Sequence, residues 1–185
     1  MKSFDSSEWV WPFPVFPGLP ARKPQISDGF HAAGDKAFRG GVGHRGQDVM
    51  LRKRLPSSAK HPWSSKWYYV EENTPALACG SGVVARAQKL ATGWCVEIAH
   101  GDGLGTTCHH LSKALVSTGV RVVAGQPIGI VGGSPIGYGL VHLHFDVKAG
   151  GKFQDAARWM RKWGYVTLDE AWGRLVVLGP LENAA

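Results

Sequence analysis

The sequence predicts a mainly β protein, a single domain built on an antiparallel β-sheet with few short helices. Its 185 residues suffice for one domain with a hydrophobic core. It contains 25 glycines and 11 prolines, which are typical of many tight turns. Short β-type runs separated by glycines fill the middle of the chain, at residues 77–79, 83–87, 94–99, 106–110, 121–123, 128–131 and 141–147.

One hairpin turn is clearly marked, and helix signals are few. Residues 100–103 read His-Gly-Asp-Gly and predict a hairpin turn between two of the runs. One helical turn is expected at residues 112–117. A longer helix is expected at residues 153–163, where apolar residues recur at three- and four-residue spacing. Residues 50–73 are expected to form an irregular loop.

Three parts are expected along the chain. Residues 1–25 are rich in proline and tryptophan and are expected to form an extended arm lying on the domain. Residues 26–150 are expected to form the functional domain. Residues 151–185 are expected to form a C-terminal extension with a short helix, packed on the same domain.

Charge and cysteine content narrow the function classes. With 21 Lys and Arg against 14 Asp and Glu, the net charge of +7 implies attraction to polyanions, such as nucleic acid, an anionic membrane or an anionic cell wall. No known nucleic-acid-binding motif is present, so we expect no nucleic-acid partner. No apolar run reaches the roughly 18 residues of a transmembrane helix. Three cysteines without a C-x-x-C pair allow at most one disulfide and indicate no cysteine zinc site.

The most informative histidines are His142 and His144, in the segment Val-His-Leu-His-Phe. Alternate residues of a strand point to the same face, so the two imidazoles are expected to share one space. Two imidazoles on one strand face suit a metal ion. With eight histidines in the chain, however, this H-x-H pair alone is a weak signal.

A catalytic metal site also needs a further ligand, commonly a carboxylate, and H-x-x-x-D is a suitable spacing. Three pairs have it: His31 and Asp35, His44 and Asp48, and His142 and Asp146. Spacing cannot choose between them. The second pair is favoured because Gly46 permits a close backbone approach and because the preceding residues are rich in glycine.

Several segments resemble, in chain order, the lysostaphin/LytM-type zinc metallopeptidases, a family of peptidoglycan endopeptidases. The resemblance extends over about residues 26–147 and is densest after Thr74. The segments are His44-x-Gly46-x-Asp48, Thr-Pro-Ala-Leu-Ala at 74–78, Gly-Val-Val at 82–84, His110-Leu111-Ser112, the glycine pattern at 125–132, and His142-Leu143-His144-Phe145.

This resemblance implies one zinc ion per chain, bound in a groove by His44, Asp48 and His144. It implies that His110 and His142 are catalytic without binding the metal. Zinc lowers the pKa of a bound water and polarises a carbonyl, while a neighbouring histidine transfers the proton. The division of acid and base roles between His110 and His142 stays open.

Some positions depart from the family pattern. Cys108 stands where the family often has tyrosine, and we expect a buried, neutral thiol. Alignment to His-Leu-Ser selects His110, and strand alternation then sends His109 to the opposite face. Asp146 is a shorter version of the usual glutamate. Three other histidines lack a supporting pattern and are expected in loops or on the surface: His31, His61 and His100.

The resemblance implies an endopeptidase that hydrolyses the peptide cross-links of peptidoglycan, with a stem peptide or cross-bridge as substrate. The alternative is a non-hydrolytic cell-wall-binding or regulatory domain that retains the metal site. A monomer acting at the cell wall or periplasm is expected. Residues 1–8 contain no readable signal peptide, which favours delivery as a phage lysin or injected effector. Loops at residues 50–73 and 132–140 are expected to select the bond.

Overall fold

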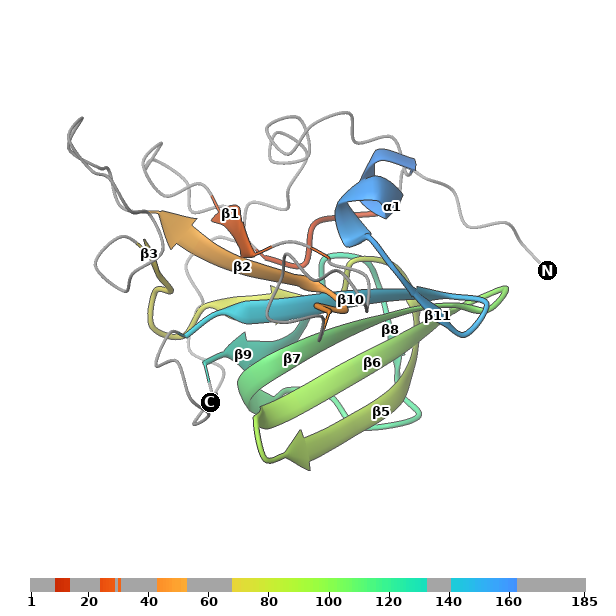
Figure 1. Ribbon diagram of the computed structural model, residues 1–185. Helices are drawn as coiled ribbons and strands as arrows, with labels where there is room; N and C mark the ends of the chain where they lie inside the picture. The colour runs from red at the N-terminus through yellow and green to blue at the C-terminus, as the bar shows by residue number, and fades with distance from the viewer. Residues whose placement is uncertain are drawn as a thin grey trace.

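Antiparallel strands make up almost all regular structure in the computed structural model (Figure 1). It describes residues 9–13, 24–28, 30, 43–52, 68–132 and 141–162. The strands are β1 (Pro24–Asp28), β2 (Gln47–Arg52), β3 (Tyr68–Tyr69), β4 (Pro75–Leu77), β5 (Gly82–Leu90), β6 (Gly93–Gly101), β7 (Leu104–Ala114), β8 (Arg121–Val122), β9 (Pro127–Val131), β10 (Leu143–Ala149) and β11 (Lys152–Gln154), and the helix is α1 (Ala156–Lys162).

The strands form one sheet whose main path runs β1-β2-β10-β7-β6-β5-β8. Four further strands attach beside this path: β9 pairs with β7, β4 with β9, β3 with β2, and β11 with β10. Every pairing is antiparallel. The predicted single, mainly antiparallel β domain is therefore confirmed. No described helix has the length and apolar character needed to cross a membrane.

The central hairpin β6–β7 shows why these segments form strands. Val96, Ile98 and His100 alternate with more exposed residues, so one face of β6 enters the core. The chain then reverses through Asp102 and Gly103, which have φ angles of +49° and +72°. The hairpin predicted from the His-Gly-Asp-Gly sequence is confirmed.

The N-terminal segment at residues 9–13 belongs to the hydrophobic core. Trp11 and Phe13 are completely buried. The backbone of this segment bonds to the β4 region, where Val10 N donates to Cys79 O at 2.8 Å and Leu77 N donates to Pro12 O at 2.8 Å. These residues are thus inserted into the domain. The predicted division into residues 1–25, 26–150 and 151–185 stays a prediction.

The expected C-terminal helix is confirmed, with a later start than predicted. Residues 152–154 form β11 instead, paired with β10. Asp155 follows and caps the helix, because its Oδ1 accepts a hydrogen bond from Ala157 N at 2.9 Å. The same oxygen accepts a bond from Gln47 Nε2 at 3.1 Å, which connects the helix start to β2.

Two other expectations for local structure are wrong. Residues 112–117 do not form a helical turn: β7 continues to Ala114, because it pairs with β9 through Lys113 and Ile130. The region 50–73 is not irregular throughout, since its two ends belong to β2 and β3, where Leu51 pairs with Tyr69. Residues 53–67, as well as His31, His61, Asp35 and residues 133–140, lie outside the described residues.

His100 is buried, which corrects the expectation of a surface or loop position. Only 1% of it is exposed, because the alternation of β6 points its side chain into the core. Nδ1–H donates to Ser81 O at 2.9 Å, and Nε2 accepts from Thr106 Oγ1 at 2.7 Å. Burial lowers the pKa of His100 from 6.5 to about 4, so the imidazole is neutral near pH 7.

The three cysteines are free and buried. Burial raises the pKa of Cys79 to about 12 and raises that of Cys108 well above its usual range. Cys108 is therefore the buried, neutral thiol that the sequence predicts.

Replacement of His100 with asparagine should reduce the acid sensitivity of folding. The folded-state pKa of His100 is lowered, so its contribution is complete above pH 6.5 and is lost as the pH falls to about 4. A shift of this size corresponds to about 3 kcal/mol. Urea unfolding near pH 7 and near pH 4 should therefore show a smaller loss of stability for His100→Asn than for the wild type. An equal loss in both proteins would contradict this assignment.

Candidate functional site

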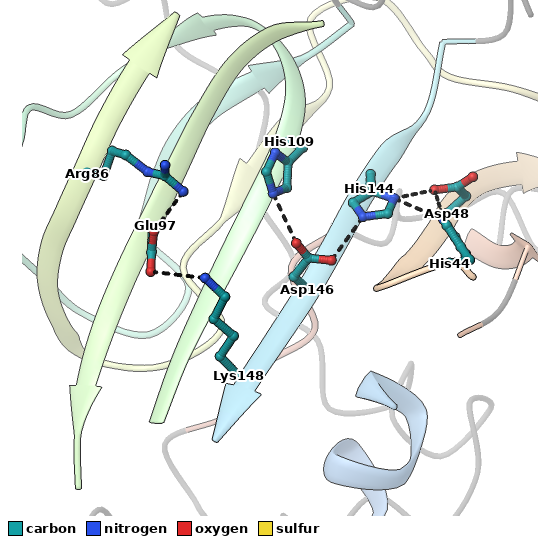
Figure 2. A network of polar contacts seen from close by, with 8 residues as sticks. All are labelled: His44, Asp48, Arg86, Glu97, His109, His144, Asp146 and Lys148. Carbon is teal, nitrogen blue, oxygen red and sulfur yellow. Dashed lines mark hydrogen bonds and ion pairs between the residues drawn. The ribbon is translucent and has the colours of Figure 1, made fainter. Parts of the chain in front are cut away.

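A row of polar residues crosses three neighbouring strands at the centre of the sheet. His144 of β10 lies directly opposite Asp48 of β2 on one side and His109 of β7 on the other. Directly paired residues of antiparallel strands point to the same face. Figure 2 shows these three side chains converging on one face of the sheet.

Three donor atoms converge beside β2. His44, which precedes β2, places Nε2 at 3.1 Å from His144 Nδ1 and at 3.2 Å from Asp48 Oδ1. His144 Nδ1 lies 2.8 Å from the same carboxylate oxygen. Among the described residues, His44, Asp48 and His144 form a group able to hold a metal ion, with ligand atoms all within 4.8 Å of one another.

The two remaining predicted site residues lie next to this group. His142 Nε2 is 3.5 Å from Asp48 Oδ1. The ring of His110 lies against that of His142, with centroids 4.7 Å apart, and its centroid is 5.6 Å from that of His144. His142 precedes β10 instead of lying in it, yet it shares the space of His144. The structure thus brings all five predicted residues together, and their roles stay predictions.

The expectation that His109 points away from the site is wrong. The pairing of His109 with His144 places His109 on the site face. Strand alternation would then send His110 to the other face, but β7 contains a bulge between Cys108 and Leu111. His110 has a φ angle of +60° there, and its ring turns back to the site. The bulge allows two consecutive histidines to serve one face.

Asp146 is a site residue that was not selected from the sequence, because the pair His44 and Asp48 was favoured over the pair His142 and Asp146. Its Oδ1 accepts a hydrogen bond from His144 Nε2–H at 2.9 Å, and its Oδ2 accepts one from His109 Nε2–H at 3.1 Å (Figure 2). A usable signal was present, because residues two apart on a strand share a face. For His109 the signal was absent, since strand register is not readable from the sequence.

The site is electrostatically coupled. Burial opposes ionisation of Asp48, but hydrogen bonds from His144 and His44 outweigh it and hold the pKa of this carboxyl far below its usual range. Asp146 behaves likewise, through His109 and His144. Burial alone would lower the pKa of His144, but hydrogen bonds to Asp146 and Asp48 raise it to about 9.

His110 has the opposite electrostatic environment. Burial, together with the proximity of His142, lowers the pKa of His110 to about 4. Its Nδ1–H donates to Thr92 O, in the turn between β5 and β6, at 3.1 Å. Nε2 is therefore the unprotonated, accepting nitrogen of this ring.

Gly46 packs directly against the site. A Cβ added there would lie 2.3 Å from Asp146 Oδ1, 2.5 Å from Phe145 O and 2.8 Å from His144 Nε2. The close approach expected from the sequence is therefore an approach to the hydrogen bond between His144 and Asp146. Only glycine allows the segment before β2 to lie there.

Further charged residues extend along the same face. Lys148 is two residues beyond Asp146 on β10, and its Nζ lies 4.0 Å from Glu97 Oε1. Arg86 of β5 approaches Glu97 Oε2 at 2.9 Å (Figure 2). These are partly exposed pairs, which contribute little to stability.

Replacement of Gly46 with alanine should disrupt the site and destabilise the fold. The added methyl group overlaps a backbone carbonyl as well as two side chains, and overpacking of this kind typically costs about 1–3 kcal/mol. Urea unfolding in the presence of a chelator measures this without a contribution from bound metal. Gly105→Ala is the matched control, since its nearest contact would be 3.3 Å from Ile98 O. Equal stability of Gly46→Ala and the wild type would contradict the observed approach.

Residues 63–156 match the model of Peptidase family M23. The chain belongs to this family. The resemblance to lysostaphin-type metallopeptidases expected from the sequence is thereby confirmed. The matched residues include His110, His142 and His144, whereas His44 and Asp48 precede them. The pairing of β2 with β10 brings Asp48 to the matched part of the chain.

One curated relative is named as a peptidoglycan endopeptidase and another as an activator of murein hydrolases. A stretch of 85 residues is 38% identical to the peptidoglycan DD-endopeptidase ShyC of Vibrio cholerae, covering 45% of this chain and 19% of that protein. Over 99 residues the chain is 33% identical to the murein hydrolase activator EnvC of Escherichia coli, covering 53% of this chain and 23% of that protein. The chain thus matches only about a fifth of the length of these relatives.

Solved structures share the fold. A zinc-containing peptidase from Vibrio cholerae aligns with a TM-score of 0.58 and 25% identity, over 84% of this chain and 39% of that one. The catalytic domain of lysostaphin from Staphylococcus simulans aligns with a TM-score of 0.52 and 24% identity, over 80% of this chain and 98% of that one. At 24% identity, the similarity to lysostaphin concerns the fold alone.

Proposed function

We propose that this chain is a zinc-dependent endopeptidase that hydrolyses peptide cross-links of bacterial peptidoglycan. The observation that carries this proposal is the convergence of His44, Asp48 and His144, with His110 and His142 beside them. Membership of Peptidase family M23 supports the reaction class. The name of the relative ShyC supports the substrate class.

The donor set fits zinc. Two imidazole nitrogens and one carboxylate oxygen are a ligand combination found in catalytic zinc sites, which keep a fourth position open. His44 Nε2, Asp48 Oδ1 and His144 Nδ1 would hold the ion. When bound, zinc would act as a Lewis acid on the scissile carbonyl and lower the pKa of a water molecule, so that this water could lose a proton and attack the carbonyl carbon near neutral pH.

His110 and His142 would handle the proton and the developing charge. Because Nδ1–H of His110 is bound to Thr92 O, its Nε2 can accept a proton. The ring of His142 lies between His110 and Asp48. In this position it can donate a hydrogen bond to a substrate oxygen. Both rings are partly exposed, so a peptide can reach them.

The substrate implies the place of action, the cell wall or periplasm. The net charge of +7 suits this setting, because it favours adsorption to an anionic polymer before cleavage.

The alternative function is a non-hydrolytic domain that binds the cell wall or regulates another hydrolase. One observation favours it: the relative EnvC is named as an activator of murein hydrolases. The five predicted site residues, four histidines and Asp48, lie together, which argues for hydrolysis. A measurement of peptidoglycan cleavage distinguishes the two functions.

Zinc should stabilise the metal-free protein against unfolding. A ligand that binds only the folded state adds about 2.7 kcal/mol when its free concentration is a hundred times its Kd. Differential scanning calorimetry of chelator-treated protein, with and without added zinc, should show this as a higher Tm. Asp48→Ala should abolish the increase and Glu72→Ala, an exposed carboxylate, should retain it. A wild-type Tm that zinc leaves unchanged would refute the metal site.

The zinc-loaded protein should release peptide fragments from purified peptidoglycan, and His142→Ala should reduce the rate by roughly a hundredfold or more. Digestion of several peptidoglycan chemotypes, with mass spectrometry of the fragments, identifies the bond. Lys113→Ala, an exposed change on β7, should cleave at the wild-type rate.

Each result of this digestion is informative. Absence of cleavage in every chemotype by a zinc-loaded wild-type protein would favour the regulatory function. Equal rates for wild type and His142→Ala would refute the proposed role of His142.

A further inference from the structure

Both carboxylate oxygens of Asp146 are used by histidines of the site. Oδ1 accepts from His144 Nε2–H at 2.9 Å, and Oδ2 accepts from His109 Nε2–H at 3.1 Å. Only 7% of the Asp146 side chain is exposed. The carboxylate is thus a buried bridge between two imidazoles on neighbouring strands, and its hydrogen bonds define which nitrogen of each ring carries the proton.

The bond to Asp146 determines which atom His144 offers to a metal. In the neutral ring, which is the form that binds a metal, donation of Nε2–H to the carboxylate leaves the lone pair of His144 on Nδ1. This is the atom that lies 2.8 Å from Asp48 and 3.1 Å from His44. Rotation of the ring by half a turn about its χ2 angle would break the bond to Asp146 and move Nδ1 away from both partners.

His109 in turn holds the carboxylate. It lies directly opposite His144 across the β10–β7 pair, and the centroids of the two rings are 5.5 Å apart. Its position is fixed by the same strand register that fixes His144. Without the bond from His109, Asp146 would keep one side-chain partner among the described residues, His144.

Gly46 closes the arrangement from a third side. The backbone there leaves no room for a side chain beside Asp146 Oδ1 and His144 Nε2. The hydrogen bond between these two atoms is therefore enclosed by β10, β7 and the segment before β2. Such enclosure restricts the rotation of both side chains.

We propose that His109 and Asp146 form a positioning pair for His144: His109 orients the Asp146 carboxylate, and Asp146 fixes the ring and the tautomer that present Nδ1 to the metal. This inference rests on the proposed zinc site. Metal-binding histidines commonly donate their second N–H to a carboxylate, and loss of that partner typically weakens metal binding by about 10- to 100-fold. His109 is a positioning residue, because it acts through Asp146.

The test measures zinc affinity of the full chain by competition with a chromogenic chelator. His109→Phe keeps a ring but removes the donor, and it should raise the Kd for zinc about tenfold. His109→Gln can place an amide Nε2–H near the same point and should restore affinity to within a few-fold of wild type. Lys113→Ala, exposed on the same strand, is the control and should bind as wild type does.

A double-mutant cycle tests whether His109 acts through Asp146. Asp146→Asn should weaken zinc binding by itself. Adding His109→Phe to Asp146→Asn should produce no further loss of zinc affinity, because the carboxylate that His109 orients is already absent. Absorption spectra of the cobalt-substituted proteins provide a second readout, with altered d–d bands expected in His109→Phe and wild-type bands in His109→Gln.

Folding is checked separately by circular dichroism and by urea unfolding with a chelator present. If His109→Phe does not fold, the comparison of His109→Gln with Asp146→Asn decides, and equal weakening in both would overturn the proposal.

Unchanged zinc affinity in His109→Phe would overturn the positioning role. So would losses that multiply in the double variant. If at the same time the wild type binds zinc and His144→Ala does not, the proposed metal site stands without the positioning pair. A wild type that binds no zinc overturns both.

Discussion

The register of β10 between β2 and β7 is the constraint on which the site depends. It places Asp48 and His109 directly opposite His144, so three strands distant in sequence deliver their side chains to one point. A slip of one residue would exchange the two faces of β10. Leu143 and Phe145, which flank His144 and are completely buried, oppose such a slip. Core packing on one face therefore maintains the chemistry on the other.

The bulge in β7 places both His109 and His110 on the face of His144. Strict alternation would allow only one of His109 and His110 to face His144. The left-handed backbone at His110, with its φ angle of +60°, is unfavourable for a non-glycine residue by roughly 1–2 kcal/mol. The structure holds it through the bond from Gly132 N to His110 O at 2.9 Å and through the burial of Leu111. Stored strain of this kind is common at functional sites.

The sequence was informative where the chemistry depends on local spacing. His142 and His144 follow from strand alternation, and the choice of His44 and Asp48 followed from the glycine between them. The structure supplies the reason for this glycine, which packs against a hydrogen bond that no local pattern reveals. His109 was assigned to the wrong face, because its position depends on pairing with a distant strand and on the bulge in β7. His100 was expected outside the core because the predicted strand ended at residue 99, whereas β6 continues to Gly101. Asp146 was passed over, although residues two apart on a strand share a face.

The residues that match the family model do not include every segment of the folded domain. The matched residues 63–156 omit β2, with Asp48, and also omit the completely buried Trp11 and Phe13. A fragment excised along the family match would retain one of the three clustered side chains that could hold a metal ion and would expose core surface that these aromatic residues cover. Transfer of this domain into another protein should therefore include the early segments together with residues 63–156, because the early segments supply part of the core and two of the three clustered side chains.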